Sequence, residues 1–198
     1  MPSPIGGRVV TLRHCAGVPP SDRMGAMPAG PTDDATPFRI SFVCTGNICR
    51  SPMAEVTMRE QVAQAGLSAQ VQVSSAGTGD WHVGERADER TIAALHEHGL
   101  DGSQHRARQF DPLAFDDYDL VVVFDRSQER ILRNWAQNDD QRDKVRMLLS
   151  FDPEQAALRD VPDPYYSDRD MFDAVLVMIE RATASLFRQL APALRQQG

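Results

Sequence analysis

Cys44 and Arg50, which are separated by five residues, are the two side chains of this sequence best suited to act together chemically. They lie in the stretch ISFVCTGNICRSP, residues 40 to 52, in which a run of apolar, β-prone residues ends at the cysteine. A thiolate is a nucleophile, and a guanidinium can hold two oxygens of a phosphate at once. The spacing therefore suggests that the arginine binds the group that the cysteine attacks.

The residues between this cysteine and arginine also favour bound negative charge. Successive backbone N–H groups of a curled loop can form an anion-binding nest. Gly46 and Asn47 tolerate the left-handed backbone conformations that a tight curl needs. Pro52 suits the first turn of a helix, whose positive end would face the same centre. Cysteines in electropositive sites ionise with pKa values of about 3.5 to 7.5, so we expect Cys44 to be a thiolate that attacks phosphorus in line.

A proton donor for the leaving group is expected in the stretch VPDPYYSD, residues 161 to 168. Asp163 lies between two prolines, which stiffen the loop and keep it out of a helix. A carboxyl near a phosphate dianion and a thiolate would have its pKa raised by like charge, and would stay protonated for acid catalysis. Tyr165 and Tyr166 would form an aromatic wall for a flat substrate group.

Both stretches also have plainer interpretations. Cys44 can be read as a buried structural cysteine next to a solvated arginine. Asp163, taken alone, fits an ordinary Asp-Pro turn. The preceding strand, the Ser-Pro helix start and the presence of both stretches in one chain favour the catalytic interpretation.

The elements that position these residues follow from the hydrophobic pattern. Strands are predicted at residues 38–43, 69–77, 119–125 and 144–151, and helices at 51–67, 88–100, 127–136 and from Asp168 or Asp170 onward. The apolar residues of the last helix lie mostly on one face: Phe172, Val175, Leu176, Ile179, Leu186 and Leu190. The alternation predicts an α/β three-layer sandwich with a four-stranded parallel sheet, whose ligands bind beyond the carboxyl ends of strands. Cys44 is placed at such an end.

Composition limits the class of protein and its surroundings. The chain has 198 residues, 41% of them hydrophobic and 25% charged, as in soluble globular proteins. A net charge of −7 argues against general binding to nucleic acid or to an anionic membrane. No apolar stretch approaches the length of a membrane span, and residues 1–37 lack the apolar core of a secretory signal. Three cysteines, an odd number, favour a reducing cytoplasmic setting over a disulfide framework.

The first 37 residues differ from the rest. They are rich in Pro, Gly and Ala and cannot bury enough apolar area to offset their ordering entropy, so we expect a disordered tail. Met24 and Met27 are alternative candidate starts within it. Residues 38–195 are predicted to form one catalytic domain.

The motifs together resemble a known family. VCTGNICRSPMAE with the later DPYY is similar to the low-molecular-weight protein tyrosine phosphatases, especially bacterial and actinobacterial members. SSAGTGDWHVGE and HRARQ resemble further family blocks in the right order, over roughly Phe38 to Leu190. The resemblance implies a flavodoxin- or Rossmann-like phosphotyrosine phosphatase I fold. It implies hydrolysis of phosphotyrosine through a phosphocysteine, with Cys44 as nucleophile, Arg50 as phosphate clamp and Asp163 as general acid and then base.

The same resemblance implies roles for the surrounding residues. Thr45, Gly46, Asn47, Ile48, Cys49 and Ser51 would complete the phosphate-binding loop. Ser51 would ease departure of the thiolate, and Asn47 would hold the loop by bonding to Ser75 and His105. The rim of the substrate pocket would comprise Asp80, Trp81, His82, Asp125, Tyr165 and Tyr166. Ser167 departs from the pattern, because relatives often have glycine there.

Cys49 has two interpretations. By resemblance it forms a disulfide with Cys44 under oxidation, which would protect the nucleophile from irreversible oxidation. Otherwise it is a small hydrophobe packed behind the loop.

Three alternative functions fit this sequence less well than hydrolysis of phosphotyrosine. Relatives that act on phosphoarginine carry threonine at the position of Ile48, so the aliphatic residue favours phosphotyrosine. Arsenate reductases of this fold need further cysteines downstream, and none follows Cys49. A non-catalytic phosphate-binding adaptor would be expected to lack Cys44, Arg50 or Asp163.

No metal or cofactor is expected, because no Cys or His group has zinc spacing and no nucleotide-binding glycine motif occurs. The expected partners are phosphotyrosine-containing proteins, with a cognate tyrosine kinase as a further candidate.

Overall fold

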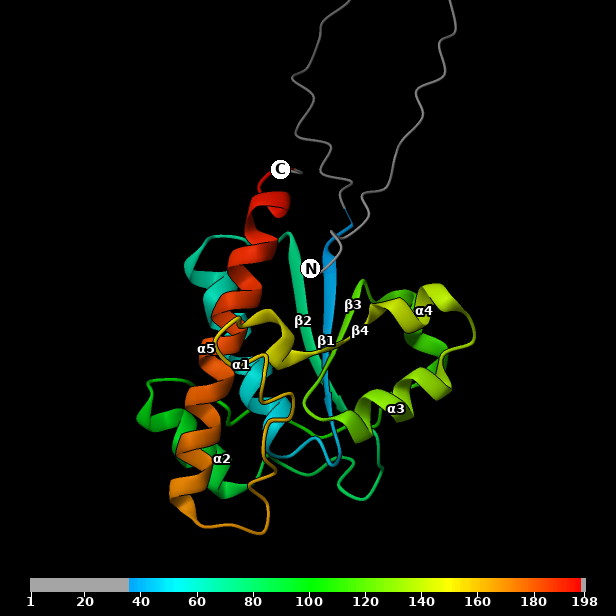
Figure 1. The fold of residues 1–198 in the computed structure, drawn as a ribbon. Helices are drawn as coiled ribbons and strands as arrows, with labels where there is room; N and C mark the ends of the chain where they lie inside the picture. The colour runs from blue at the N-terminus through cyan, green and yellow to red at the C-terminus, as the bar shows by residue number, and fades with distance from the viewer. Residues whose placement is uncertain (1–35, 197–198) are drawn as a thin grey trace, which may run out of the picture. The chain divides into compact units, whose positions relative to one another are not determined.

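The structure, a computed structural model, describes residues 36–196, in which one sheet has helices on both faces (Figure 1). The strands are β1 (Phe38–Cys44), β2 (Val71–Gly77), β3 (Leu120–Val123) and β4 (Val145–Met147). The helices are α1 (Arg50–Gln64), α2 (Glu89–Glu97), α3 (Arg126–Trp135), α4 (Asp139–Lys144) and α5 (Arg169–Leu194), and short 3-10 turns span Pro112–Asp117 and Leu148–Phe151. The tail expected at residues 1–37 lies almost wholly outside the described residues.

The four strands are all parallel and follow the order β2-β1-β3-β4. In the register, Phe42 of β1 lies opposite Ser75 of β2 and Val122 of β3. The chain leaves β1 toward β2 on one side and later returns to place β3 on the other side. The gap beyond the carboxyl ends of β1 and β3 is therefore the switch point at which open α/β sheets bind ligands. The predicted α/β class and four-stranded parallel sheet are confirmed.

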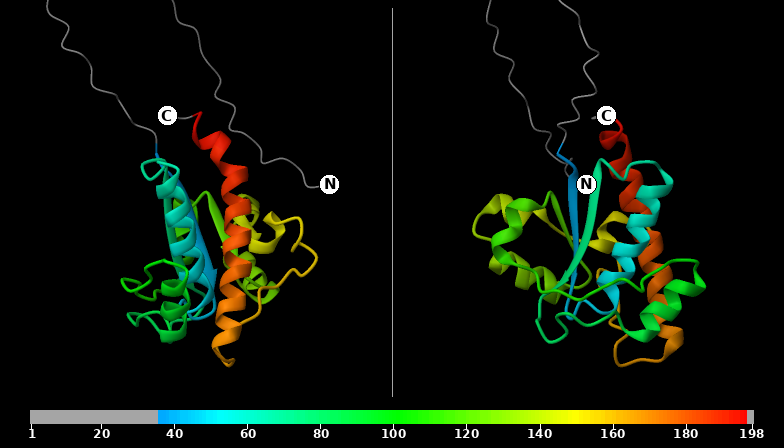
Figure 2. Two further views of the ribbon diagram at one scale, coloured as in Figure 1. Left: turned by 90° about the vertical axis from the view of Figure 1, so that its left-hand side faces the viewer. Right: turned by 180° about the vertical axis from the view of Figure 1, so that it is seen from behind.

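Alternate residues of β1 serve the two faces of the sheet. Ile40 and Phe42 belong to a buried cluster shared with α1 and α5, whereas Val43 packs in a second cluster with Leu132 of α3. Figure 2 shows α1 and α5 on one side of the sheet and α3 and α4 on the other. Strand β3 is covered on both faces and is continuously apolar, as the sequence pattern indicated, whereas β1 includes Arg39 and Ser41.

Helix ends follow the expected signals. Asp168 caps α5, its side chain accepting from the Met171 amide, so the predicted start of that helix is confirmed. Gly66 and Gly99, which follow α1 and α2, have φ angles of 70° and 75°, the left-handed conformation that glycine adopts without steric cost.

Two parts of the element prediction are wrong. The fourth strand ends at Met147, and residues 148–151 form a 3-10 turn instead. Leu148 and Leu149 are apolar because they are buried in the core, not because they pair in the sheet. Helix α4 and the turn Pro112–Asp117 were missed, since each is only six residues long and has little periodicity to detect. Within residues 36–196, no helix is both long and apolar enough to cross a membrane.

Candidate active site

The loop of residues 44–51 joins β1 to α1 and turns its carbonyl groups toward the surrounding chain. Four of its carbonyl oxygens, those of Cys44, Thr45, Asn47 and Ile48, accept hydrogen bonds of 2.7 to 2.9 Å from the amides of Thr78, Gly79 and Asp88 and the ring of His105. Among the described residues, no backbone or side-chain acceptor is bonded to the amides of residues 45–49. Amides without protein partners beside a helix N-terminus form a site for an anion.

Asn47 holds this loop in shape. Its φ is 56°, the left-handed conformation predicted for it, and its side chain is fully buried. The Nδ2 atom donates to Ser51 Oγ and Ser75 Oγ, each at 2.8 Å, and Oδ1 accepts from the Arg108 amide at 2.9 Å. Every polar atom of the side chain is therefore bonded, which is required of a buried amide.

The expectation that Gly46 serves the loop through a left-handed backbone is wrong, because its φ angle is not positive. A side chain there would instead approach the ring of His82, with a Cβ lying 3.0 Å from its Cδ2 atom. The glycine therefore allows His82 to lie close against the loop.

Glu55, a residue that the sequence did not single out, supports the loop from behind. Its Oε2 accepts from Ser75 Oγ at 2.5 Å and lies 3.5 Å from His105 Nδ1. Burial alone would raise the pKa of this carboxyl, but hydrogen bonds from His105 and Ser75 and the charge of Arg59 hold the pKa below its usual value. An ionised Glu55 is thus built into the support of Asn47.

The two cysteines of the loop differ in their surroundings. Cys44 lies at the end of β1, and its Sγ is 3.0 Å from Ser51 Oγ. Burial, followed by the negative charges of Cys44 and Asp88, raises the pKa of Cys49 to about 12. Both cysteines are buried and free. Cys49 therefore keeps its proton at neutral pH and does not compete as a nucleophile.

Arg50 begins α1 and is only 2% exposed. Its Nη1 donates to Asp125 Oδ2 at 2.9 Å and to the Val161 carbonyl at 3.2 Å, and Nη2 donates to Asp163 Oδ2 at 2.6 Å. Within residues 36–196, its buried Nε has no hydrogen-bond partner. The guanidinium is therefore fixed between two carboxylates and retains a donor for a ligand.

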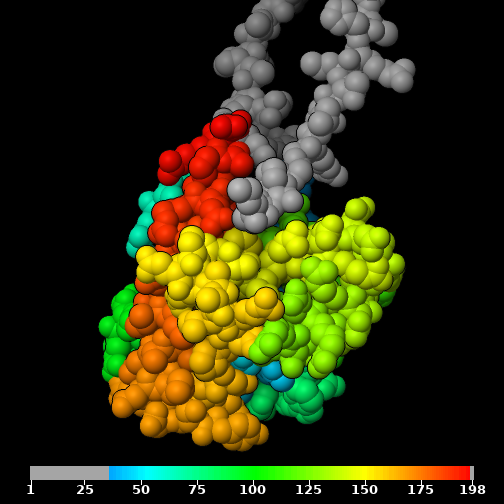
Figure 3. Space-filling view, in the orientation of Figure 1, coloured from blue at the N-terminus to red at the C-terminus, as the bar shows by residue number. Residues whose placement is uncertain are grey.

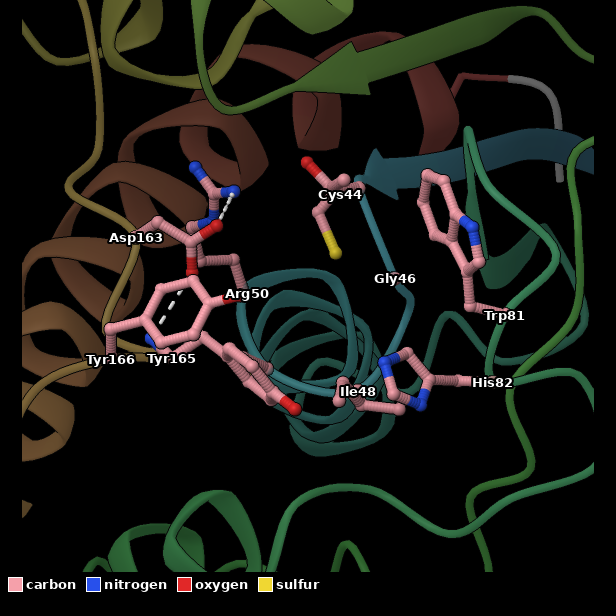
Figure 4. Close-up of a pocket in the computed structure, with 11 residues that line it drawn as sticks. Cys44, Gly46, Ile48, Arg50, Trp81, His82, Asp163, Tyr165 and Tyr166 are labelled. Atoms are coloured by element: carbon pink, nitrogen blue, oxygen red, sulfur yellow. Dashed lines mark hydrogen bonds and ion pairs between the residues drawn. The ribbon is translucent and has the colours of Figure 1, made fainter.

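These groups surround a cavity of about 360 Å³. It is lined by Cys44, Thr45, Gly46, Ile48, Cys49, Arg50, Trp81, His82, Asp163, Tyr165 and Tyr166. The surface view shows blue atoms from the end of β1 between the orange segment before α5 and the green segment after β2 (Figure 3). In the close-up, the Cys44 sulfur points into the cavity, with Asp163 and the tyrosines on one side and Trp81 and His82 on the other (Figure 4).

Most residues predicted for the rim line the cavity, but two do not. Asp125 lies behind Arg50, where it caps α3 by accepting from the Gln128 amide. Asp80 is exposed and absent from the lining. Asp80 and Asp125 therefore do not line the cavity, and the prediction for the rim is wrong in this respect. Trp81 and Tyr166 are the most exposed lining residues, at 70% and 97%.

Two further supporting residues were missed by sequence reasoning. Gln128 Nε2 donates to Thr45 Oγ1 at 3.2 Å, which links α3 to the loop of residues 44–51. Arg90 of α2 binds the backbone of the Asp163 loop. A charged or amide residue on the buried face of a helix indicates a supporting residue of this kind. Glu55 is such a residue. In the part of the chain that the structure describes, no three His, Cys, Asp or Glu side chains are grouped as metal ligands would be.

Comparison with known proteins gives one answer. The model of the family "Low molecular weight phosphotyrosine protein phosphatase" matches residues 39–196. The "Low molecular weight protein-tyrosine-phosphatase" of Streptomyces coelicolor is 50% identical over 161 residues, covering 81% of this chain and 95% of that protein. The "Low molecular weight protein-tyrosine phosphatase A" of Mycobacterium bovis is 45% identical over 165 residues, covering 82% and 97%.

Solved structures agree with the sequence matches. The crystal structure of YfkJ from Bacillus subtilis superposes with a TM-score of 0.74 at 33% identity, covering 81% of this chain and 98% of that one. The chain belongs to the low molecular weight phosphotyrosine protein phosphatase family. The predicted enzyme class, a protein-tyrosine-phosphatase, is confirmed.

Proposed function

We propose that this enzyme hydrolyses phosphotyrosine in proteins in two steps, through a phosphocysteine at Cys44. One observation carries the proposal: the Cys44 thiol, the Arg50 guanidinium and the Asp163 carboxyl meet at one cavity, beside loop amides that have no acceptor within residues 36–196. A nucleophile, a cation and an acid at an anion site are the groups that phosphoryl transfer requires.

In the first step, the phosphoryl group binds the amides of the loop and the Arg50 guanidinium. The Cys44 thiolate attacks phosphorus, so that an S–P bond forms while the bond from phosphorus to the phenolic oxygen breaks. Asp163 gives its proton to that oxygen, and tyrosine leaves as the neutral phenol. A phosphoryl group held at two points would use the unbonded Nε of Arg50 and the neighbouring Nη2, so substrate must displace Asp163 from Nη2.

In the second step, water attacks the phosphocysteine. Asp163, now ionised, accepts the proton of the water, and the S–P bond breaks to release inorganic phosphate and the thiolate. Ser51 Oγ, 3.0 Å from the sulfur, donates the hydrogen bond that stabilises the departing thiolate.

The walls of the cavity favour a flat substrate group. Trp81 lies on one side and Tyr165 and Tyr166 on the other, as Figure 4 shows. Ile48 lies at the base without a hydroxyl, which supports a phosphotyrosine substrate over phosphoarginine by the family pattern. Phosphotyrosine proteins are therefore the proposed substrates. A cognate tyrosine kinase, a cytoplasmic location and a protective Cys44–Cys49 disulfide stay predictions.

Replacement of the nucleophile tests the proposal. Cys44→Ser should lower kcat on a phosphotyrosine peptide by at least about 10³-fold, as removal of a covalent nucleophile does in other enzymes. Phosphoserine and phosphoarginine peptides should be poor substrates of the wild type in the same assay. Cys49→Ser is the matched control and should retain most activity. Turnover by Cys44→Ser at more than a few per cent of wild type would refute the mechanism.

A further inference from the structure

Arg90, in the first turn of α2, joins this helix to the segment from Tyr165 to the start of α5, which is distant in sequence. Its Nε and Nη2 atoms bind the Asp88 carboxylate at 2.9 and 2.8 Å. Nη2 also donates to the Tyr165 carbonyl at 3.0 Å, and Nη1 donates to the Ser167 carbonyl at 2.8 Å. The guanidinium carbon lies 4.4 Å from the centre of the Phe172 ring, at the start of α5. The guanidinium of Arg90 therefore donates hydrogen bonds through its N–H groups and also stacks its flat face on an aromatic ring.

These contacts form a continuous connection from the acid to the phosphate loop. Asp163 Oδ1 accepts from the Tyr165 amide at 3.2 Å, and the carbonyl of the same tyrosine is bound by Arg90. Arg90 is held by Asp88, whose own amide donates to the Ile48 carbonyl at 2.9 Å. The connection passes around the cavity and needs no substrate to complete it.

The acid loop, residues 162–167, carries Asp163 and has few other contacts that fix its height above the cavity. The Asp163 side chain is 48% exposed, and Tyr166 is almost fully exposed. Within the described part of the chain, the one hydrogen-bonded contact of Asp163 with the residues around Cys44 is its ion pair with Arg50, which the bound phosphoryl group must replace. Val161, two residues before Asp163, is fixed separately, because its amide donates to the Phe124 carbonyl at 2.8 Å and its carbonyl accepts from Arg50 at 3.2 Å. Once the Asp163–Arg50 pair opens, the two backbone bonds to Arg90 are, among the described residues, the hydrogen bonds that still tie residues 162–167 to other segments.

We propose that Arg90 is a positioning residue, which holds the Asp163 loop at the height where its carboxyl can protonate the leaving oxygen. The inference rests on the proposed function, in which Asp163 is the acid. Arg90 should therefore affect the rate only for substrates whose cleavage depends on the proton of Asp163. An ester that needs no proton should be cleaved without Arg90, whereas an ester with a basic leaving group should need it.

The experiment compares kcat/KM on two esters with each enzyme preparation: phenyl phosphate, whose leaving group needs a proton, and dinitrophenyl phosphate, whose leaving group does not. The ratio of the two values is independent of the fraction of folded enzyme, so a loss of stability does not affect it. Asp163→Ala should raise the ratio in favour of the dinitrophenyl ester by about 10²-fold, the usual contribution of a general acid. Arg90→Ala should raise it by about tenfold, because a misplaced acid retains part of its effect.

Two further variants complete the design. Arg90→Lys keeps the charge beside Asp88 but cannot bind both carbonyls, and it should behave like Arg90→Ala. The double variant Asp163→Ala with Arg90→Ala should have the ratio of Asp163→Ala alone, because residues that act through one another are not additive. Arg169→Ala is the control, since this exposed arginine pairs with Glu97 beside the same loop and should leave the ratio unchanged.

The outcomes separate the inference from the proposed function. If Asp163→Ala changes the ratio but Arg90→Ala slows both esters equally, Arg90 has only a structural role and the inference is overturned. Additive effects in the double variant would overturn it as well. If Asp163→Ala itself leaves the ratio unchanged, the assignment of Asp163 as the acid fails, and the inference fails with it.

Discussion

The two loops of the site are built in opposite ways. The phosphate loop, residues 44–51, is largely buried, and the side chain of its central Asn47 is fully enclosed with every polar atom bonded. The acid loop lies at the surface, and its Asp163 side chain is about half exposed. The phosphate loop is supported by β2, by α1 and by the His105 segment, whereas the acid loop is held through Arg50 and Arg90.

This difference matches the tasks proposed for the two loops. Donors that stabilise a transition state are effective when they are already oriented and need no rearrangement during the reaction. An acid that must first be released from an arginine needs freedom to move. We therefore expect loss of the hydrogen bonds that shape the phosphate loop to affect both stability and rate, and loss of the Asp163 carboxyl in the acid loop to affect rate alone.

Among the changes that test this contrast between the loops, Asn47→Ala is expected to have the largest combined effect on stability and rate. The change removes three hydrogen bonds of a fully buried side chain and should lower the free energy of unfolding by about 3 kcal/mol. The loss of oriented loop amides should also lower kcat by about 10²-fold. Urea unfolding and steady-state kinetics measure the two quantities.

Asn47→Gly separates the two causes of that loss. Glycine adopts the φ of 56° freely, whereas alanine costs about 1 kcal/mol more there. Asn47→Gly should therefore be more stable than Asn47→Ala by this amount but equally slow. A nearly wild-type rate in either variant would show that the side-chain bonds of Asn47 do not hold the loop.

Asp163→Asn is expected to have the reverse profile. Its kcat/KM on phenyl phosphate should fall by about 10²-fold, because the amide cannot donate the acid proton. The free energy of unfolding should change by less than about 1 kcal/mol, because the lost ion pair is half exposed. A large loss of stability measured by urea unfolding would contradict the contrast between the two loops.

A smaller effect is expected from the alkaline titration of Cys49. The unfolded thiol ionises near its ordinary value of 9.0, whereas the folded thiol keeps its proton up to about 12. The folded state then binds more protons than the unfolded state, so stability is full below pH 9 and falls as the pH rises through this window. The slope is about 1.4 kcal/mol per pH unit.

Cys49→Ala isolates this term from the other groups that titrate at high pH. The difference in unfolding free energy between wild type and variant should shrink with each pH unit above 9. Parallel curves for the two proteins from pH 8 to 11 would show that Cys49 is not held neutral by its burial.

The sequence predicted which side chains meet at the cavity better than it predicted what supports them. Cys44, Arg50 and Asp163 could be predicted because each belongs to a short motif of neighbouring residues. Such a motif can be read directly from one sequence. The left-handed Asn47 was also predictable, since asparagine tolerates that conformation. Gly46 was assigned the same conformation on the same ground, but its actual contribution is space for the His82 ring, which depends on a distant segment.

The residues that were missed act between elements. Arg90 and Gln128 bind backbone or side-chain groups about 75 to 83 residues away, and no local pattern reports such contacts. Glu55 was within reach of sequence reasoning. It lies four residues after Ser51 and three before Met58, so a helix places all three on one face. An acidic residue in that largely buried stripe is a signal of a specific partner.

The covalent intermediate is the most direct test of the account. Wild-type enzyme mixed with a phosphotyrosine peptide, stopped with acid within one turnover and digested, should yield a peptide phosphorylated on Cys44 by mass mapping. The same peptide from Cys44→Ser should carry no phosphate. Rapid turnover without phosphate on Cys44, or with phosphate on another residue, would contradict the two-step mechanism.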